Sequence, residues 1–157
     1  MAQVKVTVQN FAPRTLAATR REVTIGQVGA AWKPALDQVW EFLRSQPGLH
    51  SGGHNVFLYH HPSSRDATMQ VDFGVEVTRP FERSGEIVCT ETPAGEVAFA
   101  VHVGPYAHLK RTHDAIHAWC SENGRAIADK SWEIYGDWNN DETQLETTVV
   151  YLLSSTR

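Results

Sequence analysis

The chain has 157 residues, and its 14 Lys and Arg against 18 Asp and Glu give a formal net charge of −4. A hydrophobic fraction of 41%, with 10% aromatic residues and five Trp, excludes a disordered acidic tail, which would lack the apolar surface that offsets ordering entropy. The mild negative charge argues against direct nucleic-acid binding, because neutralising phosphates requires a concentrated basic face. We therefore expect one compact domain over residues 1–157.

The N-terminal residues and the cysteines indicate the compartment. Residues 1–5 do not form a basic segment followed by an apolar one, and no run of 18 apolar residues occurs in the sequence. We expect a cytoplasmic protein with no membrane partner. Cys89 and Cys120 lack the CxxC spacing of a metal or redox motif and are expected to be reduced thiols.

The first half of the chain predicts two strands, a helix and two strands. Residues 4–10 alternate Val with polar residues, which is the period of a half-buried strand. After Val28 the apolar spacing becomes helical, and Pro47 ends the helix. Because Pro34 is tolerated best in a first turn, we expect the helix to begin near residue 32 or 33. The expected strands are 4–10, 15–24, 55–60 and 68–78, and the expected buried arc is Val28, Trp32, Ala35, Leu36, Val39, Trp40 and Leu43.

After Pro80 the same order restarts. A helix is expected over 108–123, with Gly124 as the residue that follows its C-terminus. Trp119 is expected in the core, as are Trp32 and Trp40 of the first helix. The expected strands are 85–90, 97–103, 130–136 and 143–153, and the second buried arc is Leu109, Thr112, Ile116, Trp119 and Cys120.

The two halves, about 1–80 and 81–157, share one order of elements and therefore predict an internal duplication. Gly26 precedes the first helix as Gly104 precedes the second, and Trp40 matches Trp119. The expected fold class is α+β, with two antiparallel sheets that each carry one helix, related by a pseudo-two-fold axis around a central cleft.

Alternation along strands 55–60 and 130–136 sorts their side chains into two sets. The uniformly apolar set is expected to pack under the helices. The other set combines aromatic rings with a single carboxylate and is expected to converge on the cleft. The apolar set is Val56, Leu58, Trp132 and Ile134, and the aromatic set is Phe57, Tyr59, Glu133 and Tyr135.

A carboxylate among aromatic rings suits a small hydrophobic, cationic aromatic ligand. Desolvation destabilises the Glu133 anion, and a cation that pairs with it while stacking on a desolvated ring gains about 2 kcal/mol. Two other interpretations stay open: Glu133 acts as a general acid or base, or it is an exposed edge-strand residue beside ordinary aromatic pairs. Trp138, in the loop after this strand, either caps a ligand or rests on the surface.

The eight His residues raise the possibility of a metal site. His113 and His117 have the i, i+4 spacing of two zinc ligands, but no Glu follows His113 as the HExxH motif requires. We expect neither a metal nor a cofactor. The sequence does not decide whether His102 faces the cleft or a helix.

Three segments and one helix resemble the GyrI-like small-molecule-binding family. They are residues 101–106 (VHVGPY), the helix with Trp119 near its end, residues 131–135 (SWEIY) and residues 146–152. The Gly-Pro-Tyr turn and the Trp-Glu-x-Tyr strand are the most specific of these marks. Strands 13–22 and 71–77 also fit, so the likeness covers nearly the whole chain. The family includes the gyrase-inhibitory protein, effector-binding domains of AraC-type and MerR-type regulators, and stand-alone proteins.

The resemblance implies a duplicated βαββ-type fold whose cleft binds hydrophobic, often cationic, compounds. It places the pocket glutamate at Glu133 and puts Tyr106 and Tyr135 at the border of the cleft. Some stand-alone members resemble hydrolases of cytotoxic cyclopropanoid compounds, in which case Glu133 would be catalytic and Tyr106 would assist. A protein that inhibits a partner such as gyrase is a further alternative. With two substantial helices and no basic recognition helix, the chain is expected to be a stand-alone member. Residues 26–28 (GQV) replace the Gly-Pro-Tyr of 104–106, so an asymmetric pocket is expected.

Overall fold

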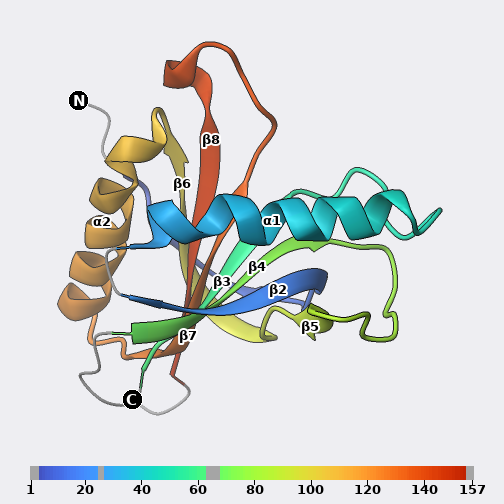
Figure 1. Cartoon of the computed structure of the whole chain (residues 1–157). Coiled ribbons are helices and arrows are strands. Elements are labelled where there is room, and N and C mark those ends of the chain that lie inside the picture. The colour runs from blue at the N-terminus through green and yellow to red at the C-terminus, as the bar shows by residue number, and fades with distance from the viewer. Residues whose placement is uncertain (1–3, 25–26, 63–67, 155–157) are drawn as a thin grey trace. The chain divides into compact units, whose positions relative to one another are not determined.

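The computed structural model describes residues 4–24, 27–62 and 68–154 (Figure 1). Its antiparallel strands and two long helices confirm the predicted α+β fold class. Gly26 and residues 63–66, predicted to precede the first helix and to form a turn, lie outside the described residues. The strands are β1 (Thr7–Phe11), β2 (Thr15–Thr24), β3 (Asn55–His60), β4 (Thr68–Glu76), β5 (Ile87–Glu91), β6 (Gly95–Val103), β7 (Ile127–Tyr135) and β8 (Glu146–Leu153). The helices are α1 (Val28–Arg44) and α2 (Leu109–Glu122), with short 3-10 helices η1 (Tyr106–His108) and η2 (Glu142–Gln144).

The chain divides into two compact units. The first unit is Pro13–Thr92, and the second unit is Met1–Ala12 together with Pro93–Arg157. In the first unit the strand order is β3-β4-β2-β5, all antiparallel, and α1 packs on β2 and β4. In the second unit the order is β1-β6-β8-β7, again antiparallel, and α2 packs on β6 and β8 (Figure 1).

The second unit takes its outermost strand from the N-terminal side of the first unit's sequence, whereas the first unit is one continuous stretch of the chain. β1 precedes the whole first unit in the chain but pairs with β6, from Thr7 opposite Phe99 to Phe11 opposite Gly95. β5 follows the first unit's other strands and pairs with β2. The two units share an order of elements, but their limits differ from 1–80 and 81–157, so the duplication with those limits stays a prediction.

Helix α1 begins earlier than its proline indicated. The helix starts at Val28, and Pro34 lies inside it. The first turn of the helix forms before the proline, since the Ala30 amide donates to the Gln27 carbonyl at 3.1 Å. Because Pro34 has no N–H, the helix lacks the one backbone hydrogen bond that this residue would donate. The predicted core position of Trp32 is wrong, because its side chain is 38% exposed. The buried residues of the helix are Ala35, Leu36, Val39 and Leu43.

Helix α2 matches its prediction closely. Its buried residues Thr112, Ile116 and Cys120 all belong to the predicted arc. The helix ends at Glu122, and Gly124 follows with a φ of +64°, the left-handed conformation that favours glycine after a helix. The core of the second unit contains Ala98, Ala100, Ile116, Cys120, Val149, Tyr151 and Leu153, with Trp119 and Leu109 partly buried against it.

The face of the first sheet that carries α1 is the aromatic one. Thr19 on β2 donates its hydroxyl to the Ala35 carbonyl of α1 at 3.0 Å. Side chains directly opposite each other in antiparallel strands share a face, and Thr19 lies opposite Phe73, which lies opposite Phe57. Phe57 and, two residues on, Tyr59 therefore lie on the side of α1. The prediction that Val56 and Leu58 pack under the helix is wrong.

The same correction holds in the second unit. Glu133 contacts α2, because its Oε2 lies 2.7 Å from Nε2 of His113. Tyr135 shares this face by alternation, whereas Trp132 and Ile134 lie on the opposite one. Hydrophobicity alone favoured the apolar pair for the helix side. The hydrogen bonds of Glu133 explain the difference, since a paired polar group can be buried under a helix.

Candidate functional site

The buried carboxylate of Glu133 is the centre of the candidate site. Only 5% of this residue is exposed. The Tyr135 hydroxyl donates to Oε1 at 2.7 Å, and Nε2 of His113 lies 2.7 Å from Oε2. The two partners come from β7 and α2, and each engages a different oxygen. Hydrogen bonds to a carboxylate favour its ionised form, whereas burial opposes it, so these two contacts offset part of the cost of burying Glu133.

His113 also contacts Tyr151, through the ring nitrogen that does not face Glu133. Its Nδ1 lies 2.7 Å from the Tyr151 hydroxyl of β8, and Nε2 of His117 lies 3.2 Å from the same oxygen. The rings of His113 and Tyr151 pack edge to face with centroids 5.6 Å apart. Burial, and then the negative charges of Glu133 and Asp114, raise the pKa of Tyr151 far above its usual value. Its hydroxyl therefore stays protonated and neutral near pH 7.

Tyr106 adds a second ring next to Tyr135. The two rings meet edge to face, with centroids 5.4 Å apart and planes at 87°. Tyr106 lies in η1, directly after the Gly104-Pro105 turn, and the Gly104 amide donates to the Leu145 carbonyl at 2.8 Å. Burial raises the pKa of the Tyr106 phenol, so it too stays neutral near pH 7. Tyr106, with 38% exposure, is the more accessible ring of the pair.

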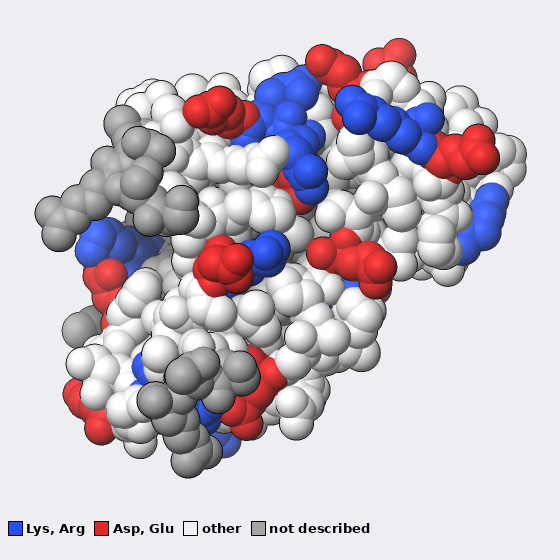
Figure 2. Space-filling view, turned by 90° about the horizontal axis from the view of Figure 1, so that it is seen from below, with Lys and Arg blue, Asp and Glu red and all other residues white. Residues whose placement is uncertain are grey.

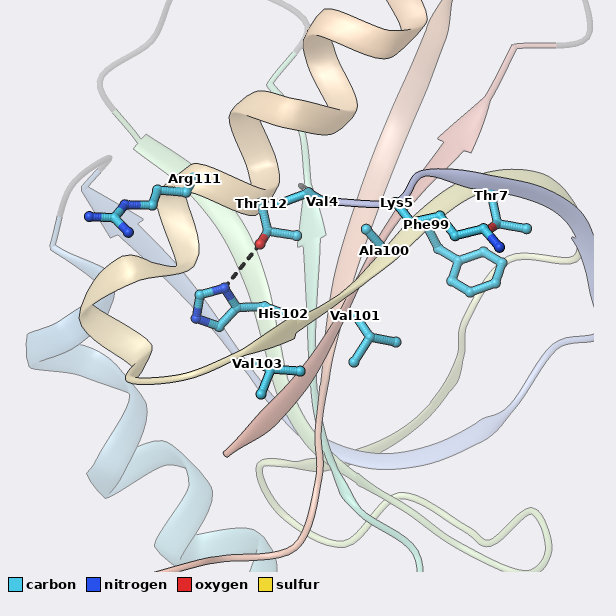
Figure 3. Close-up of a pocket in the computed structure, with 10 residues that line it drawn as sticks. All are labelled: Val4, Lys5, Thr7, Phe99, Ala100, Val101, His102, Val103, Arg111 and Thr112. Carbon is cyan, nitrogen blue, oxygen red and sulfur yellow. Dashed lines mark hydrogen bonds between the residues drawn. The ribbon is translucent and has the colours of Figure 1, made fainter. Parts of the chain in front are cut away.

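His102 faces helix α2 and supports this turn. Its Nδ1 lies 3.0 Å from the Thr112 hydroxyl, and its Nε2 lies 3.0 Å from the Pro105 carbonyl. Figure 3 shows the imidazole directed toward Thr112, on the side of β6 opposite to Val101 and Val103. The groove drawn there has a volume of about 460 Å³ and lies between the N-terminal segment, β6 and α2. Glu133 does not line this groove.

The other predicted ligand-binding residues are placed differently. Phe57 and Tyr59 belong to the first unit, where Phe57 is buried with its ring 4.8 Å from that of Phe73. Trp138 is 68% exposed, and its indole N–H donates to Asn140 at 3.1 Å. Within the second unit, the structure brings together Glu133, Tyr135 and Tyr106.

Sequence reasoning missed His113 and Tyr151 as parts of this cluster. The i, i+4 pair of His113 and His117 was considered only as a pair of metal ligands. In the structure both histidines instead contact the hydroxyl of Tyr151. Within residues 4–24, 27–62 and 68–154, no group of three or more His, Cys, Asp or Glu is arranged to hold a metal ion.

The surface charges alternate in sign on the face that Figure 2 shows. Lys and Arg lie next to Asp and Glu in small groups, with no broad basic area among the coloured side chains in that view. Among the described residues, no helix has both the length and the apolar character needed to cross a bilayer.

An antiparallel α+β fold with a buried carboxylate and neighbouring tyrosine rings has the features of a small-molecule-binding domain. The family model described as the GyrI-like small molecule binding domain matches residues 5–152, so the chain belongs to the GyrI-like family. This confirms the resemblance that its Gly-Pro-Tyr and Trp-Glu-x-Tyr segments indicated. No match is found among curated proteins.

Solved structures with this fold include a domain of EcmrR, a ligand-bound protein and a hydrolase. The C-terminal domain of EcmrR is 19% identical with a TM-score of 0.78, covering 98% of this chain and 99% of that one. SAV2435 bound to tetraphenylphosphonium is 9% identical with a TM-score of 0.73, covering 96% and 94%. A hydrolase encoded by lin2189 from Listeria innocua is 13% identical with a TM-score of 0.65, covering 96% and 92%. At these identities the likeness shows the fold alone.

Proposed function

We propose that the protein binds hydrophobic, cationic aromatic compounds at a site centred on Glu133. The observation that carries the proposal is a carboxylate with 5% exposure whose two oxygens are held by Tyr135 and His113. Such a charge has lost most of its water, and a cation without strong hydration restores the lost interaction. Tyr106 and Tyr135 offer ring surface on which an aromatic ligand stacks. The tetraphenylphosphonium bound by SAV2435 belongs to this chemical class.

For the remaining predicted contacts the proposal rests on the sequence. Phe57 is buried and Tyr59 is partly buried in the first unit, and Trp138 has an exposed indole in the second. Alanine variants of these three residues should be tested for binding of tetraphenylphosphonium by isothermal titration. In this proposal the protein is a cytoplasmic binder of drugs or toxins.

Glu133→Gln is expected to weaken binding of tetraphenylphosphonium by about 10- to 100-fold, because it removes the negative charge and keeps the side-chain shape. Isothermal titration at pH 7.5 measures the change. Tetraphenylborate has the same shape and the opposite charge, so its binding should be unchanged or tighter in this variant. Glu122→Gln, on the exposed end of α2, is the matched control and should bind both ions as the wild type does. Equal affinity of wild type and Glu133→Gln for the phosphonium would refute the anchor role.

A second candidate function is hydrolysis of a strained small molecule such as a cyclopropanoid compound. It is favoured by the short contacts that connect Glu133 through His113 to Tyr151, which give the carboxylate partners for proton transfer. Glu133 would accept the proton of the attacking water, with Tyr106 assisting. Mass spectrometry of a cyclopropanoid panel tests this function. Product formation that Glu133→Gln abolishes would support it, and intact compound after prolonged incubation would exclude it for that panel.

A further inference from the structure

We propose that His113 is a positioning residue of the binding site, which holds the Glu133 carboxylate in one orientation and in its charged form. The proposal rests on the proposed function, since it assumes that Glu133 is the anchor. It assigns a role to a helix residue whose spacing to His117 otherwise indicates only a pair of metal ligands.

Glu133, His113, Tyr151 and His117 form a series of hydrogen bonds in which the donor of each bond can be assigned. An ionised Glu133 only accepts, so the Tyr135 hydroxyl donates to Oε1 and the His113 Nε2–H donates to Oε2, both at 2.7 Å. A neutral His113 then has a bare Nδ1, which accepts from the Tyr151 hydroxyl at 2.7 Å. The oxygen of Tyr151 in turn accepts from Nε2–H of His117 at 3.2 Å. Each of these four hydrogen bonds then has one donor and one acceptor, with no extra proton on any group.

Tyr151 supports the tautomer that this role needs. An ionised Glu133 requires the proton of a neutral His113 on Nε2, and the Tyr151 hydroxyl can then donate to the bare Nδ1. Tyr151 can donate because it stays neutral, and its ring packs on His113 edge to face and limits rotation of the imidazole. The exposed residue His117 ends the chain at the surface.

Two donors on different oxygens determine how Glu133 meets a ligand. The terminal torsion of a glutamate is broad and nearly two-fold, so a carboxylate with one partner can rotate. With Tyr135 on Oε1 and His113 on Oε2 the plane of the Glu133 carboxylate is fixed. Without the His113 donor, burial favours the protonated carboxyl, and the site loses the charge that distinguishes a cation from an anion of equal shape.

The experiment compares His113→Leu, which removes the donor, with His113→Gln, whose amide N–H can replace it. Tetraphenylphosphonium and tetraphenylborate are titrated into each variant and into His108→Gln, a surface control just before α2. His113→Leu should bind the phosphonium about tenfold more weakly and the borate no more weakly. His113→Gln should keep more than half of the wild-type preference for the cation. A loss of both ions to the same extent in His113→Leu would overturn the proposal, because it indicates a purely structural role.

A double variant and a spectrum separate this proposal from the proposed function. If His113 acts through Glu133, His113→Leu/Glu133→Gln should bind the phosphonium no more weakly than Glu133→Gln alone, and additive losses would overturn the proposal. If the wild type does not prefer the phosphonium at all, the proposed function fails, and the imidazole ¹H–¹⁵N spectrum decides the positioning role. A His113 Nε2–H signal that exchanges slowly in wild type and is lost in Glu133→Gln supports positioning. The same signal in both proteins refutes it.

Discussion

Replacing Arg20 with methionine is expected to lower the free energy of unfolding by about 3 kcal/mol, because it leaves a buried carboxylate with one partner fewer. Asp72 on β4 has a fully buried side chain. Arg20 binds it through two hydrogen bonds, Nε to Oδ1 at 2.7 Å and a terminal N–H to Oδ2 at 3.1 Å. Nε2 of His60 lies 2.9 Å from Oδ2 and remains in the variant. The expected loss of stability is therefore at the lower end of the range for breaking a buried ion pair. Methionine retains the alkyl stem, so the loss reports on the charge.

Urea unfolding of three further variants tests this interpretation. Arg21→Met is the matched control, since Arg21 pairs with the exposed Glu86 and should contribute less than about 1 kcal/mol. Arg20→Met/Asp72→Leu removes both buried-pair partners and should recover to within about 1 kcal/mol of wild type, because no uncompensated carboxylate remains. A double variant as unstable as Arg20→Met would contradict the desolvation argument.

The stability of the wild type should also depend on pH, because Asp72 must be ionised to pair with Arg20. Burial acts to raise the pKa of Asp72, but the hydrogen bonds and positive charges of His60 and Arg20 outweigh burial and hold this pKa below its usual value. A carboxylate with a depressed folded pKa stabilises the fold above the unfolded value of about 3.9. This contribution is lost as the pH falls through the folded pKa. Wild type should therefore lose stability below about pH 4 faster than the double variant, and parallel curves would contradict this assignment.

Strand positions were predictable where alternation is bounded by polar loops. β3 occupies the predicted residues 55–60, and β2 occupies 15–24. β8 starts at Glu146 instead of 143, because the Asp141 carboxylate accepts from the Thr143 amide at 3.0 Å and turns the chain into η2. A side chain that bonds the backbone two residues on competes with a strand, and this competition is invisible to a hydrophobic pattern.

The chemistry of the site was predictable in part. The residue types along β7 identified Glu133 and Tyr135 as one set, and the Gly-Pro-Tyr turn pointed to Tyr106. The face that meets the helix was not predictable, since it depends on a hydrogen bond between residues 20 positions apart. Tyr151 lies 38 positions from His113, so their contact arises only when β8 and α2 pack together. Periodicity sorts side chains within one element and carries no information on such pairs.

Two adjacent glycines follow α1 and precede β3, and the structure gives them different roles. Gly52 has a φ of +72°, with open space around a Cβ placed there. A Cβ on Gly53 would overlap the carbonyl oxygen of Glu76 and lie 2.9 Å from its carbonyl carbon. This approach belongs to the pairing of the loop with β4, where the Glu76 amide donates to the His54 carbonyl at 3.0 Å. His50 holds the other side, with Nε2 2.9 Å from the Gly53 carbonyl.

Gly53→Ala is accordingly expected to destabilise the protein by about 3 kcal/mol, since a methyl group against backbone atoms forces the strands of the first unit apart. Gly52→Ala places the same methyl in open space and should lose only about 1 kcal/mol, the strain of a left-handed backbone. Urea unfolding gives both values, and hydrogen exchange at the Glu76 amide should accelerate in Gly53→Ala alone. Equal losses in the two variants would mean that backbone conformation, and not close approach, is the reason for glycine at both positions.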